Sequence, residues 1–438
     1  MTARNWLSTE LSAKLAREND LNVIAVTPDA SDRDVGRGQG FTWVPLLKIR
    51  GASFGTRLRL IAGYLLHLIV VFRFNAVAGF RGAEQRLRQS RRLRRLAVRD
   101  GVPASRLFGW PFPKSRALLS FLKSCYVSKW QRFADVEKLF EEMQPALLVL
   151  GHVQNHFSTP YALAAIARDI PILGVIGSWD QPTTKGPLCP GISHYLAQSR
   201  AVAEDLQRYH GVPPKAVDVV GWPQMDIFVR RQPCPRTELL TALGLPTDTQ
   251  YILLGSSPER LGHNEPRIAR DLATMLAQQN KCALVIRAHP NDRIWRERFA
   301  ALHCPPHVVV LPPELGQMDR LADQIHHAAV VLSPAGSILL DAVALDTPAV
   351  ALAFENEDEP FDDRLARRYD MEHWSDLVST EGVFLVRSQQ QLEEAVLGSL
   401  QEGTLGSAGR ARLRSSYLEP LDGKVADRIV AAIVKAAS

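Results

Sequence analysis

Residues 328–352, AAVVLSPAGSILLDAVALDTPAVAL, have the pattern of a strand, a tight turn, a helix and a second strand. The apolar run at 329–332 is typical of a buried strand, and a small, hydroxyl-rich turn follows it directly. Residues 338–345 have apolar side chains at helical spacing, and a proline-bearing turn leads to the strand at 349–352. The stretch therefore predicts a β-α-β unit of a parallel sheet.

The turn before this helix has the chemistry of an anion site. A helix that begins with Gly336 and Ser337 directly after a strand presents backbone N–H groups to a phosphate. Asp341, one turn later, lies where a carboxylate accepts hydrogen bonds from ribose hydroxyls. Because the turn matches neither the Walker A nor the G-x-G-x-x-G pattern, an ordinary serine-capped β-α-β unit is the competing interpretation.

Length and composition describe a globular protein. A chain of 438 residues predicts two domains, and 46% hydrophobic with 22% charged residues is ordinary for such a protein. The five cysteines are odd in number and have no metal-binding spacing, which is typical of a reducing cytoplasm. The N-terminus has no secretory signal pattern, and the longest apolar run, at 60–72, is shorter than the roughly 20 residues of a membrane span. The sequence thus predicts a cytoplasmic protein without a transmembrane helix.

The start of the chain is unusual for an α/β domain. Residues 4–17 are typical of a helix and residues 22–27 of a strand, so the chain opens on a helix where a central strand is usual. The first strand is therefore missing from this pattern. Glu10 would lie near the mouth of the predicted sheet.

Residues 55–143 form a basic and helical block. The pattern predicts an apolar helix at 56–74, an arginine-rich helix at 84–99 and a long helix at 115–143. In one interpretation the block covers the first sheet and has a solvated charged face. In another, apolar and cationic surfaces hold the protein on an anionic membrane, with about 1 kcal/mol from each basic residue. Nucleic acid is disfavoured as a partner because no recognition motif accompanies the arginines.

From Pro145 onward strands and helices alternate regularly, in two halves. Further strands are expected at 146–150, 171–176, 192–197, 216–220, 251–254, 283–287, 308–311 and 383–386, and helices at 157–168, 201–210, 266–279, 390–400, 406–416 and 424–437. The polar segment at 230–235 marks the boundary region. We predict one Rossmann-like domain at 1–225 with a helical insertion at 55–143, a second at 226–405, and C-terminal helices at 406–438 that pack back toward the first domain.

Polar residues collect at the predicted carboxyl ends of the strands, where open parallel sheets bind ligands. In the first half these are His152, Asn155, His156, Ser178, Asp180, Thr184 and Lys185; in the second they are Ser256, Ser257, His289 and residues 333–337. The distribution predicts a cleft between the domains, with an anion on the second and a base on the first. The two histidines four residues apart have a helical metal spacing but lack a third ligand, so we expect no metal.

Each of these residues has an alternative structural role. Asp180 could cap a turn, Lys185 could belong to a solvated loop instead of holding an anion, and His289 could bond the backbone instead of a phosphate. These alternatives stay open at the level of sequence.

The motifs and their order resemble the GT-B glycosyltransferases. The likeness is greatest to the branch shared with bacterial surface-polysaccharide transferases, and looser to CDP-glycerol glycerophosphotransferases and UDP-N-acetylglucosamine 2-epimerases. It is carried by Gly255-Ser256-Ser257, Arg287-Ala288-His289-Pro290, residues 333–350, and Gly221-Trp222-Pro223-Gln224-Met225-Asp226, which is similar to the Gly-x-Pro-x-x-Asp hinge. Arg4-Asn5-Trp6-Leu7, and Ser178-Trp179-Asp180 with Lys185-Gly186, are similar to this bacterial branch as well. The likeness covers residues 145–355, whereas residues 40–140 match little.

The resemblance implies an α/β fold of two Rossmann-like domains facing each other across a cleft. It also implies a metal-independent glycosyltransferase that moves a sugar from a nucleotide-sugar donor to a lipid-linked or polysaccharide acceptor in bacterial cell-surface glycan synthesis. The donor is a substrate, and no cofactor is expected. The first domain would hold the acceptor and the second the donor. The enzyme would lie in the cytoplasm, on the inner face of the plasma membrane.

The resemblance also assigns roles to residues. The diphosphate would be bound by Ser256, Ser257, Ser333, Gly336 and Ser337, the ribose by Asp341, with His289 and Lys185 as further donor contacts; Asp180 would be the base, with His152 and Glu10 as alternatives. This sequence departs from the family in its missing first strand and in having Asp rather than the commoner Glu at 341. Glycerophosphotransfer, 2-epimerisation and a non-enzymatic scaffold for a membrane or polyanion are the alternative functions.

Overall fold

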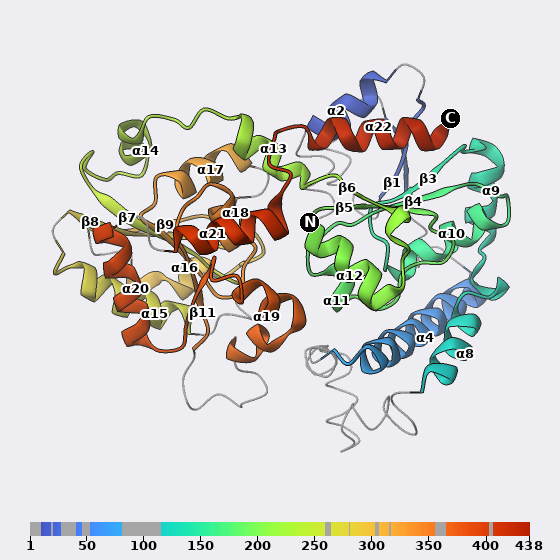
Figure 1. Cartoon of the computed structure of the whole chain (residues 1–438), viewed down its shortest axis with the longest axis horizontal. Coiled ribbons are helices and arrows are strands. Elements are labelled where there is room, and N and C mark those ends of the chain that lie inside the picture. The colour runs from blue at the N-terminus through green and yellow to red at the C-terminus, as the bar shows by residue number, and fades with distance from the viewer. Residues whose placement is uncertain are drawn as a thin grey trace. The chain divides into compact units, whose positions relative to one another are not determined.

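The computed structural model describes residues 10–18, 21–27, 41–45, 53–80, 115–258, 264–279, 281–302, 306–314, 317–354, 365–402 and 406–438. Contacts divide the chain into two compact units. Unit 1 comprises Met1–Gln224 and Lys424–Ser438, and unit 2 comprises Met225–Gly423. Figure 1 shows helices around a parallel sheet in each unit. The predicted boundary at 225/226 lies next to the observed one.

The main sheet of unit 1 has four parallel strands that lie side by side in chain order. They are β3 (Leu148–Leu150), β4 (Ile172–Val175), β5 (His194–Ala197) and β6 (Val217–Val219). Among the helices, α10 (Thr159–Ile166) contacts β3, and α12 (Arg200–His210) contacts β5 and β6. Two strands nearer the N-terminus, β1 (Ile24–Thr27) and β2 (Thr42–Pro45), form a separate parallel pair. The short elements are η2 (His156–Ser158), α11 (Gln181–Thr184), η3 (Pro214–Ala216) and α13 (Pro223–Arg230).

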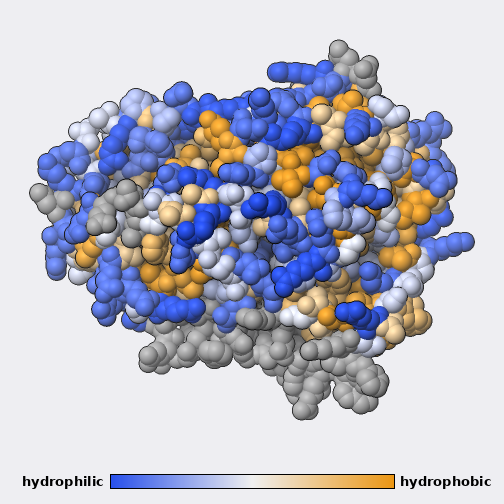
Figure 2. All heavy atoms as spheres, viewed as in Figure 1, coloured by the Kyte–Doolittle hydropathy of each residue, from blue (hydrophilic) through white to orange (hydrophobic). Residues whose placement is uncertain are grey.

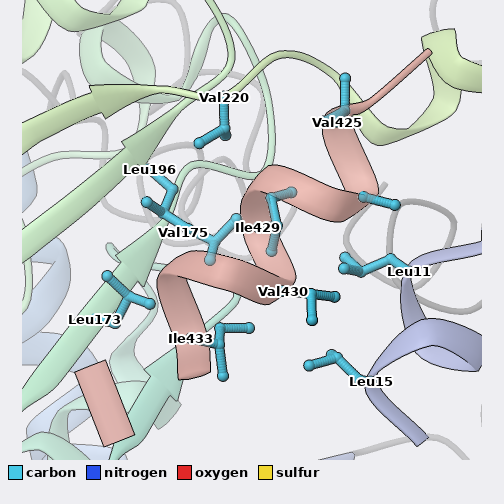
Figure 3. Packing of buried hydrophobic residues seen from close by; sticks show 11 residues of the cluster. Leu11, Leu15, Leu173, Val175, Leu196, Val220, Val425, Ile429, Val430 and Ile433 are labelled. Carbon is cyan, nitrogen blue, oxygen red and sulfur yellow. The ribbon is translucent and has the colours of Figure 1, made fainter. Parts of the chain in front are cut away.

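The last helix of the chain contributes to the core of unit 1. Figure 3 shows α22 (Val425–Ala437) between the strands β4 and β5 and the helix α2 (Glu10–Arg17). Ile429, with no exposed surface, lies in one buried cluster with Leu11 of α2, Val175 of β4 and Leu196 of β5. The two ends of the chain are therefore joined through a shared apolar core.

The predicted C-terminal helices do not stay together. α22 belongs to unit 1, but α21 (Ser407–Leu413) and the π-helical turn at Arg414–Leu418 belong to unit 2. Arg410 of α21 is buried and donates from Nε to Asp346 Oδ1 at 2.8 Å. The prediction that all of 406–438 packs toward the first domain is therefore wrong for residues 406–423.

A helical hairpin covers another part of unit 1. α4 (Phe54–Ala78) extends the predicted helix at both ends and packs along α8 (Arg116–Tyr126). The single helix predicted at 115–143 is wrong, because η1 (Lys129–Gln131) separates α8 from α9 (Ala134–Met143). The break is held by Arg59 of α4, which donates to the carbonyl oxygens of Trp130 and Arg132. The predicted helix at 84–99 lies outside the described residues.

Among the helices that the structure describes, α4 alone is long and apolar enough to cross a membrane. Its mean hydropathy reaches 1.8 over an 18-residue window, of which 39% is buried in the protein.

Unit 2 contains a six-stranded parallel sheet in the order β12-β11-β10-β7-β8-β9. The bounds are β7 (Gln250–Gly255), β8 (Cys282–Arg287), β9 (Val308–Leu311), β10 (Val330–Ser333), β11 (Ala349–Leu352) and β12 (Phe384–Val386). β10 and β11 are buried along their whole length, as continuous apolar runs in covered parallel sheets usually are. The chain runs outward from β7 to β9, returns to the other side of β7 as β10, and continues outward to β12. The strand order therefore reverses between β7 and β10.

Helices on this sheet contact one another in two groups. α15 (Glu265–Leu276) contacts α20 (Gln389–Glu402), and α17 (Met318–His326) contacts α18 (Ile338–Ala344). The remaining elements are α14 (Arg236–Ala242), α16 (Trp295–Arg298), η5 (Ala300–Leu302), η7 (Leu365–Asp370) and α19 (Glu372–Val378).

The packing of α22 on α2, β4 and β5 can be tested by substitution. We expect Ile429→Ala to lower the free energy of unfolding by about 2–5 kcal/mol, because it leaves a cavity among residues of α2, β4 and β5. Lys435→Ala, on the exposed side of the same helix, should change it by less than about 0.5 kcal/mol. Urea unfolding followed by circular dichroism measures both values. Equal effects of the two substitutions would contradict the packing described.

Candidate functional site

The carboxyl ends of β7 and β10 meet where the strand order of unit 2 reverses. In open α/β sheets this reversal leaves a crevice at the carboxyl edge, and ligands bind there. The turns that follow the two strands are Gly255-Ser256-Ser257 and Ser333-Pro334-Ala335-Gly336-Ser337, both predicted from sequence as donor contacts. The structure therefore brings the two predicted turns to one place.

Hydrogen bonds join the strand ends at this point. Ser333 Oγ donates to the carbonyl oxygen of Gly255 at 2.8 Å, and Ser256 Oγ accepts from the backbone N–H of His289 at 3.0 Å. His289 Nδ1 accepts in turn from the backbone N–H of Asn291 at 3.0 Å. Hydrogen bonds thus join the end of β10 to that of β7, and the end of β7 to that of β8. Because the Ser333 hydroxyl makes the first of these bonds, its role in the structure is to hold the two turns together.

Two glycines keep the turns close. A Cβ on Gly255 would lie 2.8 Å from Ile338 Cδ1, and a Cβ on Gly336 would lie 2.5 Å from Ser333 Oγ. Neither position has room for a side chain without movement of its neighbour. The absence of a Cβ lets the start of α18 approach the end of β7.

The other residues of the turn divide into exposed and buried ones. The backbone N–H of Ala335 donates to the hydroxyl of Tyr369 at 2.7 Å. Ser337 occupies the N-cap position of α18 without a capping side-chain bond, and it is partly exposed. Asp341 is 1% exposed and lies in the first turn of the helix. Ser337 is therefore accessible to a ligand from solvent, and Asp341 is enclosed.

A buried ionic network supports the β7 turn, and sequence reasoning missed it. Glu265 accepts the backbone N–H of Ser257 on both carboxylate oxygens, at 2.8 and 3.0 Å. Arg298 donates to Glu265 at 2.9 Å, to the carbonyl oxygen of Ser257 at 2.9 Å, and to Asp292. Burial raises the pKa of the Glu265 carboxyl to about 7, against the opposing charge of Arg298. The network fixes both backbone polar groups of Ser257, and no local motif signals it.

The candidate base lies at the carboxyl end of β4 in unit 1. Asp180 occupies the N-cap position of α11 and accepts hydrogen bonds from Ser178 Oγ and, at 3.0 Å, from Thr184 Oγ1. Asp180 and Lys185 are both close enough to His152 to affect its pKa, which burial lowers first and the charge of Lys185 lowers further. The structure thus brings together three of the residues predicted for this half of the site.

A neighbouring amide determines which nitrogen of His152 carries the proton. Gln181 Oε1 accepts from the backbone N–H of Gly177 at 2.7 Å, so its Nε2 is the atom 3.1 Å from His152 Nδ1. An amide nitrogen only donates, and therefore Nδ1 accepts and Nε2 carries the proton in the neutral ring. His152 Nε2 is then a hydrogen-bond donor, and the unprotonated Nδ1 is engaged by the Gln181 amide and is not available as a general base.

The structure places His156 beside α4 and α8, and Glu10 at the start of α2. His156 is buried with Tyr126, whose hydroxyl lies 3.1 Å from His156 Nδ1, and with His67 of α4, with a ring distance of 5.7 Å. Burial lowers the pKa of His156 and of His67 to about 4. Glu10 begins α2 and pairs with Lys14 at 3.8 Å. Residues 1–9, which include the Arg4-Asn5-Trp6-Leu7 motif, lie outside the described part of the chain.

A further polar side chain at the strand ends of unit 1 was missed. Gln198 follows β5, is 1% exposed, and lines a small hollow with Gly177 and Gly221. Both atoms of its amide are buried without a hydrogen-bond partner. Such an amide is suited to a bound water or ligand hydroxyl. Within the described residues no group of His, Cys, Asp and Glu is placed to hold a metal ion.

The fold is of the GT-B class, with two Rossmann-like α/β units in one chain, as the sequence predicted. Among solved structures, the chain is similar to a UDP-N-acetylglucosamine 2-epimerase at 12% identity, with 99% of this chain and 92% of that chain covered and a TM-score of 0.56. The 2-epimerase of Neisseria meningitidis bound to UDP-GlcNAc gives 13% identity, coverage of 99% and 97%, and a TM-score of 0.54. MnaA of S. aureus with UDP gives 15% identity, coverage of 68% and 78%, and a TM-score of 0.50. At these identities the likeness concerns the fold. No protein-family model and no curated protein matches the chain.

The contribution of the buried network beneath the β7 turn to stability can be tested by substitution. We expect Arg298→Ala to lower the free energy of unfolding by about 3–5 kcal/mol, because it leaves Glu265 and Asp292 buried without their cation. Arg296→Ala, on the exposed side of α16, is the matched control and should change it by less than about 0.5 kcal/mol. Denaturant unfolding at several pH values measures both.

The effect of pH follows from the pKa of Glu265. Because that pKa is raised above its usual 4.5 to about 7 even with Arg298 present, the folded protein favours the protonated carboxyl, and loss of the cation strengthens this preference. The loss in the free energy of unfolding caused by Arg298→Ala should therefore be largest above pH 7 and should shrink as the pH is lowered toward 4.5. A loss in the free energy of unfolding that does not depend on pH would contradict the ionic role of the network.

Proposed function

We propose that the protein is a nucleotide-sugar enzyme, and specifically a glycosyltransferase that moves the sugar to a lipid-linked or polysaccharide acceptor. The observation that carries the proposal is the reversal of strand order in unit 2, with both hydroxyl-rich turns at its carboxyl edge. Neither turn contains an acidic residue, so neither opposes a diphosphate electrostatically. The fold likeness to enzymes solved with UDP and UDP-GlcNAc supports the same ligand class.

In this proposal the donor diphosphate contacts Ser256, Gly336 and Ser337, whereas contact of the ribose with Asp341, which is 1% exposed, would need the first turn of α18 to move. Ser257 and Ser333 hold the turns in position through the bonds that their backbone or side chain already makes. The site therefore needs no rearrangement of these two residues when it binds a nucleotide. Preorganised donors of this kind stabilise the charge that develops on the leaving diphosphate.

Asp180 is the proposed base on unit 1. It would take the proton of the acceptor hydroxyl as that oxygen bonds to the sugar and the bond from the sugar to the diphosphate breaks. Two hydroxyl donors orient its carboxylate. His152, with its proton on Nε2, would donate a hydrogen bond to the acceptor or sugar instead of serving as the alternative base.

A 2-epimerase is the second candidate, favoured by the structural neighbours. An epimerase converts a nucleotide sugar without an acceptor, whereas a transferase releases nucleoside diphosphate and requires an acceptor for full turnover. Incubation with UDP-GlcNAc, with products identified by NMR, separates the two. A 2-epimer formed without release of UDP would decide for the epimerase.

Ser337→Asp tests the anion site. An aspartate is favoured at a helix N-cap, so the stability of unit 2 should be kept, while its charge repels a diphosphate. We expect calorimetric titration with UDP, CDP and GDP to show binding of at least one nucleotide to the natural protein, and a loss of roughly 100-fold or more in affinity for the variant. Ser388→Asp is the control, because Ser388 caps α20 on the far edge of the sheet by accepting from Gln391 N–H. The absence of any nucleotide affinity in the natural protein would reject the proposal.

Asp180→Asn tests the base. The amide keeps the shape of the side chain and one acceptor oxygen but cannot take up a proton. With a donor that binds, we expect nucleoside diphosphate release to fall by about 10²–10⁴-fold while the donor Kd changes less than about twofold. Asp218→Asn, an exposed carboxylate on β6, should leave both unchanged. Full activity in the Asp180 variant would show that another group accepts the proton.

A further inference from the structure

The helix α4 differs from an ordinary surface helix of a globular protein in being apolar on its outer side as well. Such a helix normally places its apolar stripe on the core and its charged residues in solvent. α4 packs apolar residues such as Val70 and Phe74, together with several polar ones, on the protein, and it leaves a second apolar stripe outside.

The polar residues lie on the inner side of α4. Arg59 donates to the backbone of η1, with 2.7 Å from Nη2 to the carbonyl oxygen of Arg132. His67 lies against the ring of Tyr126 at 5.4 Å. Arg73 and Asn75, near the end of the helix, are 4% and 3% exposed. These contacts fix the orientation of the helix on unit 1.

The outer side of α4 has the apolar residues. Phe54, Leu58, Ile61 and Leu65 are 83%, 57%, 51% and 48% exposed, and their spacing of four, three and four residues places them on one face. Phe121 of the neighbouring α8 is 64% exposed. Figure 2 shows hydrophobic side chains at the lower right of the view, where Figure 1 places α4 and α8. A contiguous stripe of this kind marks a binding surface.

The charge of this region is strongly positive. Residues 53–132 contain 17 Arg and Lys against two acidic residues, Glu84 and Asp100, a net charge of +15. The whole chain carries +6, so the remaining residues together carry −9. Neither α4 nor α8 contains an acidic residue, and Arg116, Lys123 and Lys129 are exposed on α8 and η1.

From these observations we infer that the surface formed by α4 and α8 binds an anionic phospholipid bilayer. Acyl chains accept the Leu, Ile and Phe stripe, and anionic head groups accept the surrounding cations. A second copy of the chain is the wrong partner for this surface, because the described residues 53–80 and 115–132 contain seven Arg and Lys and no acidic residue, so two copies would bring like charges together. Nucleic acid would match the charge but offers no apolar phase for the stripe.

The helix lies on the bilayer and does not cross it. A crossing helix must meet lipid on all sides, whereas the inner side of α4 is bonded to η1 and packed on Tyr126 and Leu119 of α8. The inference is independent of the proposed function, because it concerns a surface of unit 1 and not the nucleotide turns of unit 2.

Vesicle flotation of the full chain tests the inference. We expect binding to vesicles of phosphatidylcholine with phosphatidylglycerol, weaker binding to phosphatidylcholine alone, and loss of binding as salt is raised. The triple variant Leu58→Gln, Ile61→Gln, Leu65→Gln should bind roughly tenfold less, and so should Lys123→Glu with Lys129→Glu. Controls are Met143→Gln with Val229→Gln, which change exposed apolar residues elsewhere, and Lys215→Glu on η3; both should bind as the natural protein does.

Measurements of stability, nucleotide affinity, oligomeric state and extraction by carbonate separate the possible explanations of the vesicle result. The replaced side chains are exposed, so the melting temperature and the nucleotide affinity of each variant should be unchanged, which separates this inference from the proposed function. Failure of the natural protein to bind the anionic vesicles, or full binding by the triple variant, would overturn the inference. A dimer in solution that the triple variant dissociates would assign the stripe to a second copy. Resistance to extraction by alkaline carbonate would show a helix that crosses the membrane.

Discussion

The arrangement of the candidate anion site in unit 2 depends on the hydrogen bond from Ser333 Oγ to the carbonyl oxygen of Gly255. It joins the ends of β10 and β7, two strands that are neighbours in the sheet but about 80 residues apart in the chain. Because β10 returns beside β7 after β9, both turns end at one edge. Gly255 and Gly336 lack the side chains that would separate them, and Glu265 with Arg298 holds Ser257 from below.

The polar groups at the strand ends of the two units are held by different chemistry. In unit 2 a buried carboxylate and guanidinium fix a backbone turn that itself contains no acidic residue. In unit 1 hydroxyl groups hold the Asp180 carboxylate, and the amide of Gln181 sets the proton on His152. The first arrangement suits the binding of a charged group, and the second suits the transfer of a proton, because hydroxyl partners can follow a change in charge by rotation.

Local features of this structure could be predicted from the sequence, and long-range ones could not. The strand and turn at 330–337 follow from apolar runs, Pro334 and small residues, all within a few positions. The strand order that makes this turn a site is not encoded locally, and neither is the pairing of Glu265 with Arg298, 33 residues apart. The break after α8 was missed because Arg59, on another helix, satisfies the carbonyl groups that a continuous helix would use. Asp180 was predicted because a polar residue after a buried strand is a local signal, and it also occupies the N-cap position of α11, where its carboxylate accepts from Thr184.

α4 and the candidate base lie next to each other in unit 1, and this connects the two inferences drawn for that unit. Val71 of α4 contacts Gly186, the residue after Lys185, so closely that no side chain fits there. Phe74 of α4 stacks on His210, with ring centroids 4.9 Å apart, and His210 Nε2 lies 2.7 Å from the carbonyl oxygen of Pro182. The loop that holds Asp180 therefore rests on the inner side of the helix whose outer side is apolar. A helix is about 10 Å thick, so a bilayer beneath α4 would bring head groups within reach of this loop. An acceptor carried on a lipid is the kind of substrate that this placement favours, because its lipid part stays in the membrane while its hydroxyl approaches the base.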